Sequence, residues 1–162
     1  MNIPLIASQP QYSMLWRVIE TDVIPTCQRE GLGQIVWSPL AQGILTGKYQ
    51  PGQALPIQSR ANSDAGKPFF QKLVQRWMSD DVLTAIQKLN PIAQETNLTL
   101  SQLAVAWVLQ NPAVSSAIIG ASNPEQIREN VIASGVTLQP EIMDQIDNVL
   151  KGFVEYDPSK TG

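Results

Sequence analysis

The sequence predicts an α/β fold in which helices connect parallel strands. Short apolar runs typical of buried strands alternate along the chain with apolar residues at helical spacing. A length of 162 residues, with 43% hydrophobic and 15% charged residues, is typical of one globular domain. Parallel strands are usually flanked by further strands, and only three are predicted here. The pattern therefore predicts part of a larger sheet, because three parallel strands alone leave two edges open.

The first predicted strand covers residues 3–8, an apolar run that ends in a polar stretch. Apolar residues then recur at helical spacing from Leu15 to Cys27, and we expect Pro25 to kink or divide that helix. Residues 34–38 form the second predicted strand. Residues 39–67 follow as a long irregular stretch rich in proline and glycine. Loops of this length in compact domains are usually functional or disordered.

The second half of the chain carries clear helix-start signals. Ser79 precedes two aspartates, which are favourable at the positive end of a helix dipole, and we expect Pro91 to kink this helix. Thr99 and Gln102 form a predicted capping box, and the apolar helix that follows should end before Pro112.

Residues 116–120 form the third predicted strand. The next helix is predicted to begin at Asn123, with Pro124 at its first helical position, and the last helix to begin near Pro140. We expect residues 1–152 to form the folded part and residues 153–162 to form a loosely held C-terminal tail.

The composition excludes several classes of function. A net charge of -3 without a basic stripe argues against a nucleic-acid or acidic-membrane partner. The absence of histidine excludes a histidine general base or a histidine metal ligand, and the single cysteine excludes an intramolecular disulfide. The start of the chain lacks secretory-signal features, and the apolar run 103–109 is too short to span a bilayer. We therefore expect a cytoplasmic protein with no metal site.

In parallel α/β folds a ligand binds beyond the carboxyl ends of the strands. That rule selects residues 8–9, 37–39 and 120–123. In the last of these, Gly120 would let the backbone approach a ligand, and the following helix N-terminus would suit a phosphate. The alternative, which the residues alone favour, is that Asn123 caps an ordinary helix and Gly120 only turns the chain.

The second strand end carries an aromatic residue, Trp37, followed by small residues and Lys48. The indole could stack on a planar ring while backbone amides and the lysine meet charged groups, although Trp37 could equally be a core residue. The glycine–lysine spacing does not fit a Walker A loop.

Arg60, in the long loop, is either a ligand contact or a solvated surface arginine. The weaker candidates are Cys27, which fits a small core residue, and Asp80 and Asp81, which the helix dipole explains.

Several of these segments together closely resemble the aldo-keto reductases, and the branch with bacterial general-stress reductases and voltage-gated potassium channel beta subunits in particular. The resemblance covers about residues 3–150. Its motifs are Trp-Ser-Pro-Leu-Ala-Gln-Gly-Ile-Leu-Thr-Gly-Lys-Tyr at 37–49, Ser-Arg-Ala at 59–61 and Ile-Ile-Gly-Ala-Ser-Asn at 118–123, followed by Gln126, Glu129 and Asn130.

The resemblance implies the C-terminal part of a (β/α)₈ barrel, an incomplete barrel in which the three predicted strands correspond to strands six to eight. It also implies an NADP(H) site. Gln9 matches the residue that bonds the nicotinamide carboxamide, and Trp37 matches the aromatic that stacks on the ring. Further matches are Ser38, Pro39, Leu40, Gln42 and Lys48 around the pyrophosphate, Arg60 closing over the cofactor, and Gly120, Ser122, Gln126, Glu129 and Asn130 at the adenosine and 2′-phosphate end.

The chain departs from the family where catalysis is concerned. The family's aspartate, tyrosine, lysine and histidine tetrad lies in the first half of the barrel, and nothing here matches it. We therefore predict no catalytic residue and an isolated chain without carbonyl reductase activity. Three roles remain open: the cofactor platform of an oxidoreductase acting on a carbonyl substrate, a non-catalytic NADP(H)-binding regulatory module, and a self-associating partial barrel. The expected partner is either a second copy of the chain or a complementary N-terminal half.

Overall fold

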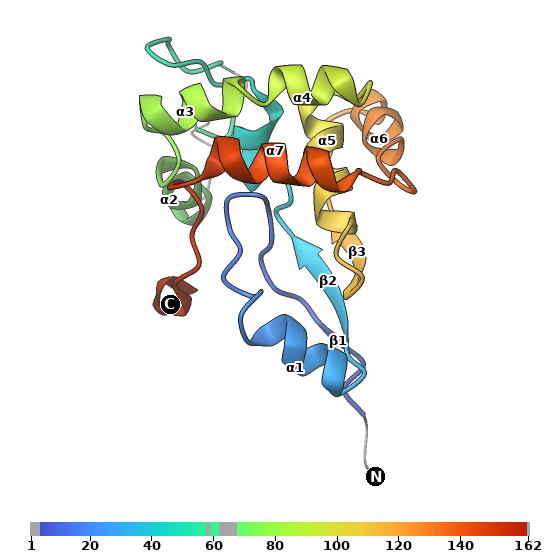
Figure 1. Ribbon diagram of the computed structural model, residues 1–162. Helices are drawn as coiled ribbons and strands as arrows, with labels where there is room; N and C mark the ends of the chain where they lie inside the picture. Colours follow the sequence, from blue (N-terminus) through green and yellow to red (C-terminus); the bar gives the residue numbers. More distant parts are fainter. Residues whose placement is uncertain (1–3, 58, 62–67, 162) are drawn as a thin grey trace.

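The computed structural model describes residues 4–57, 59–61 and 68–161. A three-stranded sheet in these residues has the order β1-β2-β3, formed by β1 (Ala7–Ser8), β2 (Gly33–Trp37) and β3 (Val114–Ile118). Both pairings are parallel, as the sequence predicts, with Ser8 opposite Gln34 and Trp37 opposite Ile118 (Figure 1). The carboxyl ends of the strands therefore lie at one edge of the sheet.

The other named elements of the described structure are helices (Figure 1). Helix α1 (Val23–Arg29) joins β1 to β2, and the 3₁₀ helix η1 (Ala41–Thr46) follows β2. The connection from η1 to β3 contains α2 (Pro68–Gln75), α3 (Asp80–Gln87), α4 (Asn90–Glu95) and α5 (Leu100–Leu109). Helix α6 (Pro124–Val131), α7 (Pro140–Leu150) and the 3₁₀ helix η2 (Pro158–Thr161) complete the order.

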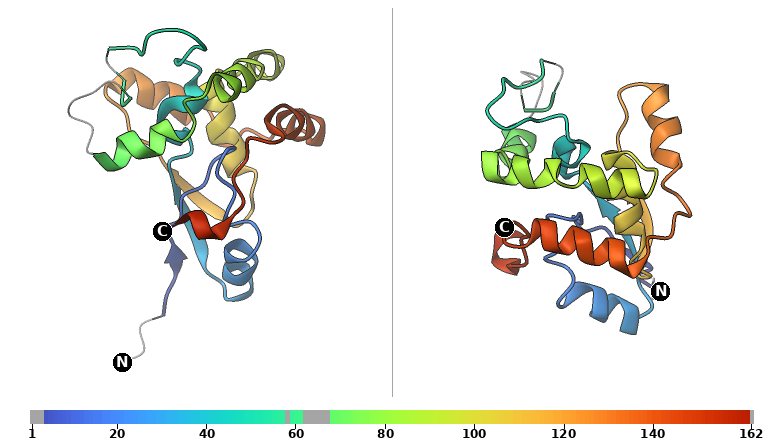
Figure 2. Two further views of the ribbon diagram at one scale, coloured as in Figure 1. Left: turned by 90° about the vertical axis from the view of Figure 1, so that its left-hand side faces the viewer. Right: turned by 45° about the horizontal axis from the view of Figure 1, so that its top comes forward.

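The core lies on one face of the sheet. Helices α1, α5 and α7 are on the same side of the strands, as the left view of Figure 2 shows. In β2, Gln34 and Val36 are fully buried on this side. Ile35 and Trp37 point to the opposite face and are only half-buried. The face that would line the inside of a closed barrel is thus the more open one.

The sequence prediction is wrong for the segment from Leu15 to Cys27. Residues 13–16 form a tight turn in which Ser13 and Trp16 pair, and helix begins only at Val23. Leu15, Val18 and Ile19 are buried, but in turns. Pro25 does not kink a helix, because it lies in the first turn of α1, where the missing N–H has no helical partner to lose.

The other differences are smaller. The first strand is confined to Ala7–Ser8, and residue 3 lies outside the described residues. The third strand begins and ends two residues earlier than predicted, so Gly120 follows it. The predicted helix after Ser79 is two helices, with Pro91 in the first turn of α4. The irregular stretch after Pro39 contains η1, and α2 was not predicted.

The predicted caps are confirmed. Ser79 Oγ accepts a hydrogen bond from Val82 N, and the capping box of Thr99 and Gln102 is complete on both sides. Asn123 caps α6, whose first residue is Pro124. These signals are local, so they do not depend on the rest of the fold.

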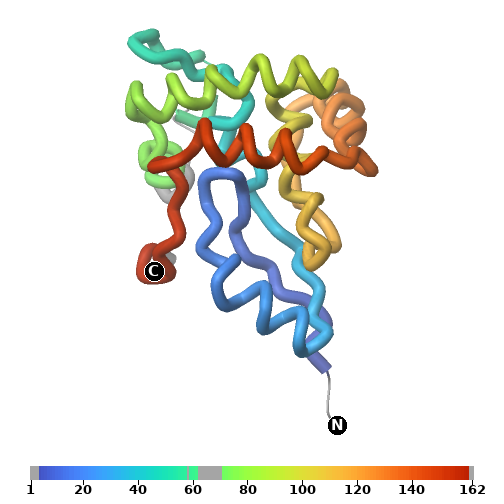
Figure 3. Tube along the Cα trace, viewed as in Figure 1, coloured from blue at the N-terminus to red at the C-terminus, as the bar shows by residue number. Residues whose placement is uncertain are grey.

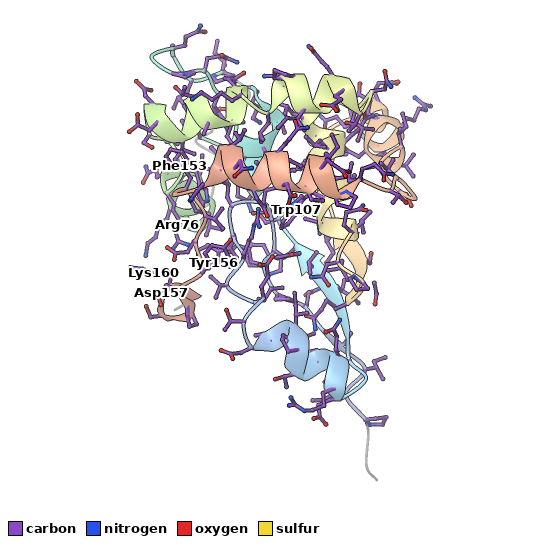
Figure 4. All side chains as sticks on the ribbon, in the orientation of Figure 1. Arg76, Trp107, Phe153, Tyr156, Asp157 and Lys160 are labelled. Carbon is purple, nitrogen blue, oxygen red and sulfur yellow. The ribbon has the colours of Figure 1, made fainter. Side chains whose placement is uncertain are left out.

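The start of the C-terminal tail is held through Glu155, contrary to expectation. Glu155 N donates to Leu15 O, and Arg17 N donates to Glu155 O, both at 2.9 Å, so the tail runs beside the 13–16 turn (Figure 3). Arg17 is buried, and its guanidinium bonds Asp147 of α7 at 2.6 Å and lies 4.4 Å from the Trp107 ring centroid. Arg76 stacks on Trp16, on the side of the molecule where the tail leaves α7 (Figure 4).

Candidate functional site

The candidate site lies at the carboxyl edge of the sheet. The segment that follows β1 lies beside the end of β2. Trp37 N donates to Pro10 O at 3.0 Å, and Tyr12 N donates to Trp37 O at 3.2 Å. The exposed Gln9 belongs to this segment. The structure therefore brings the segments of the first two predicted contacts together, and the half-buried Trp37 keeps part of its side chain accessible.

The loop after Trp37 has an unusual backbone. Ser38, Ala41 and Gln42 all have positive φ, at 63°, 45° and 59°. Such conformations cost non-glycine residues about 1–3 kcal/mol each and persist where neighbouring structure enforces them. Here the Gln42 side chain, which is buried, donates from Nε2 to Ser38 Oγ at 2.8 Å. The loop is thus fixed in one shape at the strand end, which is where strained backbone is often functional.

Arg60 links the loop after β2 to the residues that follow β3. Its Nη1 donates to Gln42 Oε1, so Gln42 is bonded on both sides. On the other strand, a Cβ at Gly120 would lie 3.4 Å from Arg60 Nη2. The guanidinium therefore lies between two of the three predicted ligand-binding segments, although they are far apart in the sequence.

A second cation, Lys48, approaches the same loop. A Cβ at Gly43 would lie 2.9 Å from both Lys48 Cε and Nζ, so only glycine allows this approach. Burial lowers the pKa of Lys48 below its usual value, and the positive charge of Arg60 lowers it further. An anion bound between the two side chains would offset this repulsion. The electrostatics of the site therefore favour a negatively charged ligand.

Two buried hydroxyls next to these cations were not singled out from the sequence. Tyr49, beneath the Lys48 ammonium at 5.2 Å from its ring centroid, is 1% exposed, and Ser59, beside Arg60, is 2% exposed. Within the described part of the chain, neither hydroxyl has a hydrogen-bond partner. A buried hydroxyl without a partner costs about 1–3 kcal/mol, so each group has unused capacity for a buried water. Their burial depends on tertiary contacts, which the sequence does not reveal.

The end of β3 leads into a well-capped helix. Asn123 Oδ1 accepts from Gln126 N at 3.0 Å, which confirms the capping interpretation. Gln126 Oε1 in turn accepts from Ser122 N at 2.9 Å and from Ser122 Oγ at 3.2 Å. Three further predicted contacts are neighbours on the surface of α6, because residues three and four apart in a helix lie side by side. They are Gln126, Glu129 and Asn130, and Asn130 is buried. In the contacts described above, Gln126, Glu129 and Asn130 have no direct contact with Lys48. Arg60, which lies near Gly120, connects the two parts of the site.

The weaker candidates have structural roles. Asp80 Oδ1 accepts from Gly52 N at 3.0 Å at the start of α3, and Cys27 is buried on α1. Among the described residues, no group of acidic or cysteine side chains could hold a metal ion. None of the helices in this part of the chain is both long and apolar enough to cross a bilayer.

Comparisons with known proteins agree on one family. The sequence model of the Aldo/keto reductase family matches residues 1–151. A probable voltage-gated potassium channel subunit beta of Arabidopsis thaliana is 43% identical over 149 residues, covering 90% of this chain and 44% of the relative. An L-glyceraldehyde 3-phosphate reductase of Escherichia coli K12 is 37% identical over 148 residues, covering 90% of this chain and 42% of the relative.

A solved structure supports the same assignment of fold. The glycerol dehydrogenase AKR11B4 of Gluconobacter oxydans superposes with a TM-score of 0.74 at 27% identity, over 96% of this chain and 46% of that chain. The strands and helices described above are therefore part of a (β/α)₈ barrel. The chain spans less than half the length of each of these relatives.

Proposed function

Since this chain belongs to the aldo/keto reductase family of oxidoreductases, we propose that the carboxyl edge of its sheet is a platform for NADP(H). The observation that carries the proposal is the convergence of Lys48 and Arg60 on the fixed loop after β2. Two cations that approach the same loop fit the phosphate oxygens of a dinucleotide, because cationic donors form strong, charge-assisted hydrogen bonds with phosphate.

The remaining residues would hold the two ends of the cofactor. Trp37, which is half-buried and lies beside the segment that carries Gln9, would stack on the nicotinamide ring. The loop residues Ser38, Pro39, Leu40 and Gln42 would surround the pyrophosphate. The end of β3 and helix α6 would hold the adenosine end through Gly120, Ser122, Gln126, Glu129 and Asn130.

The bound cofactor would supply a hydride to a carbonyl substrate. The residues of this chain would bind and orient the nicotinamide, while proton transfer would need an acid from another segment, because this sequence has no histidine and no match to the family's tetrad. We propose that the chain alone does not turn over aldehydes. Measurable oxidation of NADPH by the pure chain with an aldehyde, lost in Trp37→Ala, would contradict this.

The platform is tested by titrating the chain with NADPH, NADH and inorganic pyrophosphate, followed by tryptophan fluorescence and calorimetry. Lys48→Ala should weaken all three ligands about tenfold, as expected for the loss of one partly exposed charge-assisted bond. Gln126→Ala should weaken NADPH more than NADH, because only NADPH carries the 2′-phosphate. Lys160→Ala, at an exposed position in η2, is the matched control and should change nothing. Saturation by none of the ligands at millimolar concentration would refute the platform.

A second candidate function is a binding module that holds NADP(H) without turnover. The observation that favours it is the 41–43% identity to three proteins described as probable or putative potassium channel beta subunits. The two functions differ in one readout. The chain, combined with the rest of a barrel, oxidises NADPH in the presence of an aldehyde only if it is an oxidoreductase platform.

A further inference from the structure

The backbone on both sides of Lys48 is held by a side chain from a distant part of the chain. Gln87, the last residue of α3, donates from Nε2 to Gly47 O at 3.1 Å and to Tyr49 O at 3.2 Å. These two residues flank Lys48, so one amide group holds the backbone before and after it. Gly47 O also accepts from Gln50 Nε2 at 2.9 Å, a bond within the same segment, whereas the bond to Tyr49 O comes from α3.

The orientation of the Gln87 amide is itself fixed. Asn90, the first residue of α4, donates from Nδ2 to Gln87 Oε1 at 3.1 Å and to Gln87 O at 2.9 Å. A side-chain amide has an acceptor on one side and two N–H donors on the other. Because its oxygen faces Asn90, its two donors face the carbonyls of Gly47 and Tyr49.

Helix α3 holds the same segment at a second point. Asp80 Oδ1, at the start of the helix, accepts from Gly52 N at 3.0 Å. Asp80 and Gln87 are the first and last residues of α3 and lie about two turns apart, which places them on one face of the helix. Residues 47–52 are therefore attached to one helix near both of their ends.

The place of the Lys48 ammonium is one that a free lysine side chain would leave. The ammonium lies 5.2 Å from the Tyr49 ring centroid, and only the missing Cβ of Gly43 lets it approach the loop after β2. Burial lowers its pKa, and the charge of Arg60 lowers it further. A long, flexible side chain gains rotamer freedom and hydration by moving into solvent. The attachment of its backbone to α3 limits that movement.

We propose that Gln87 is a positioning residue, which holds Lys48 in the place from which its ammonium meets an anionic group bound at the platform. The ligand in this inference rests on the proposed function, whereas the attachment of the Lys48 segment to α3 does not. Loss of the Gln87 amide leaves the charge of Lys48 unchanged and loosens only its place. The loss of affinity should therefore be smaller than that caused by Lys48→Ala.

The test is a double-mutant cycle of Gln87→Met and Lys48→Ala in the full chain, measured by calorimetric titration with inorganic pyrophosphate. Methionine keeps the length of the side chain and removes the amide. Gln87→Met should weaken pyrophosphate binding about threefold to fivefold when Lys48 is present. It should change the affinity less than about 1.5-fold when residue 48 is already alanine, because a residue that acts through another has no effect once the other is removed.

Gln110→Met is the matched control. Gln110 Nε2 also donates to two backbone carbonyls, Ala106 O at 2.7 Å and Val136 O at 2.9 Å, and Gln110 Oε1 accepts from Leu138 N at 3.0 Å. This variant should lower the urea midpoint at least as much as Gln87→Met does, and it should leave the pyrophosphate affinity unchanged. An equal loss of affinity in both variants would show a general loosening of the fold and would contradict the role given to Gln87.

A second measurement needs no ligand. The pKa of Lys48 can be followed by NMR after ¹³C-methylation of the lysines, with its signal assigned by its absence in Lys48→Ala. In Gln87→Met this pKa should rise toward its ordinary value, because the ammonium then moves into solvent, whereas in Gln110→Met it should stay low. If Gln87→Met does not fold, Asn90→Ala takes its place, since it frees the Gln87 amide to turn and should shift the pKa in the same direction.

Three further results would overturn the inference. One is an unchanged pyrophosphate affinity in Gln87→Met although Lys48→Ala weakens binding. Another is an equal loss with and without Lys48, because Gln87 would then act through other groups. The third is an unchanged pKa of Lys48 in Gln87→Met. A wild-type chain that binds no pyrophosphate refutes the platform, and the pKa of Lys48 then still decides whether Gln87 holds this lysine in place.

Discussion

Gly43 gives a direct test of the cation site. In Gly43→Ala the added Cβ would lie 2.9 Å from Lys48 Cε and Nζ, at a residue with φ of 99°. The backbone cost of a left-handed conformation in alanine is about 1–2 kcal/mol. The clash involves the end of a flexible side chain, so we expect the ammonium to move away rather than the core to rearrange. The variant should therefore lose mainly the ligand contact of Lys48.

Gly52→Ala is the matched control. Gly52 also has positive φ, 65°, but an added Cβ would meet nothing within 4 Å. Both variants should lose about 1–2 kcal/mol of unfolding free energy and should therefore unfold at lower urea concentration. Only Gly43→Ala should weaken pyrophosphate binding in calorimetry, by about tenfold, equivalent to 1.4 kcal/mol. Equal pyrophosphate affinities in the two variants would refute the placement of Lys48 at the site.

Three further predictions concern stability. Burial raises the pKa of Glu20, and the hydrogen bond from Tyr12 and the charge of Arg17 only partly oppose this shift. The unfolding free energy should therefore fall as the pH rises from about 4.5 through the raised pKa. Glu20→Gln keeps an acceptor for Tyr12 and should flatten this part of the pH profile in urea titrations. Asp147→Asn should lower the unfolding free energy by about 1–2 kcal/mol, because the buried Arg17 loses its charged partner; an unchanged urea midpoint would show that solvent replaces it. Thr99→Ala should cost about 1 kcal/mol by removing one side of the capping box, and Thr99→Ser should restore most of it.

The elements predicted correctly are those with local causes. Thr99 and Asn123 mark their helices because each side chain satisfies a backbone N–H three residues away. The segment from Leu15 to Ile19 was mispredicted because its burial has a distant cause. The tail bonds Leu15 and Arg17 across most of the chain length, and a turn held in this way can bury the same residues as an amphipathic helix.

In the candidate site too, residues marked by local sequence signals could be predicted, whereas those that depend on distant contacts could not. Trp37 and Lys48 could be selected from the sequence, because a strand end and a glycine-rich loop are visible in it. The left-handed backbone at Ser38 and Gln42 could not, since neither residue favours that conformation. It follows from contacts between Gln42, Ser38 and Arg60 that only the folded chain brings together.

These contacts bear on whether the cofactor platform exists before a ligand binds. Arg60 bonds Gln42 in the loop after β2 and lies beside Gly120, which follows β3. The residues expected to bind phosphate therefore contact one another within the described part of this chain. If pyrophosphate binds the wild-type chain and Gln42→Ala weakens that binding, the platform is preformed and Gln42 holds it in shape. If Gln42→Ala binds pyrophosphate as tightly as the wild-type chain does, other contacts hold the loop and the role given to Gln42 is wrong.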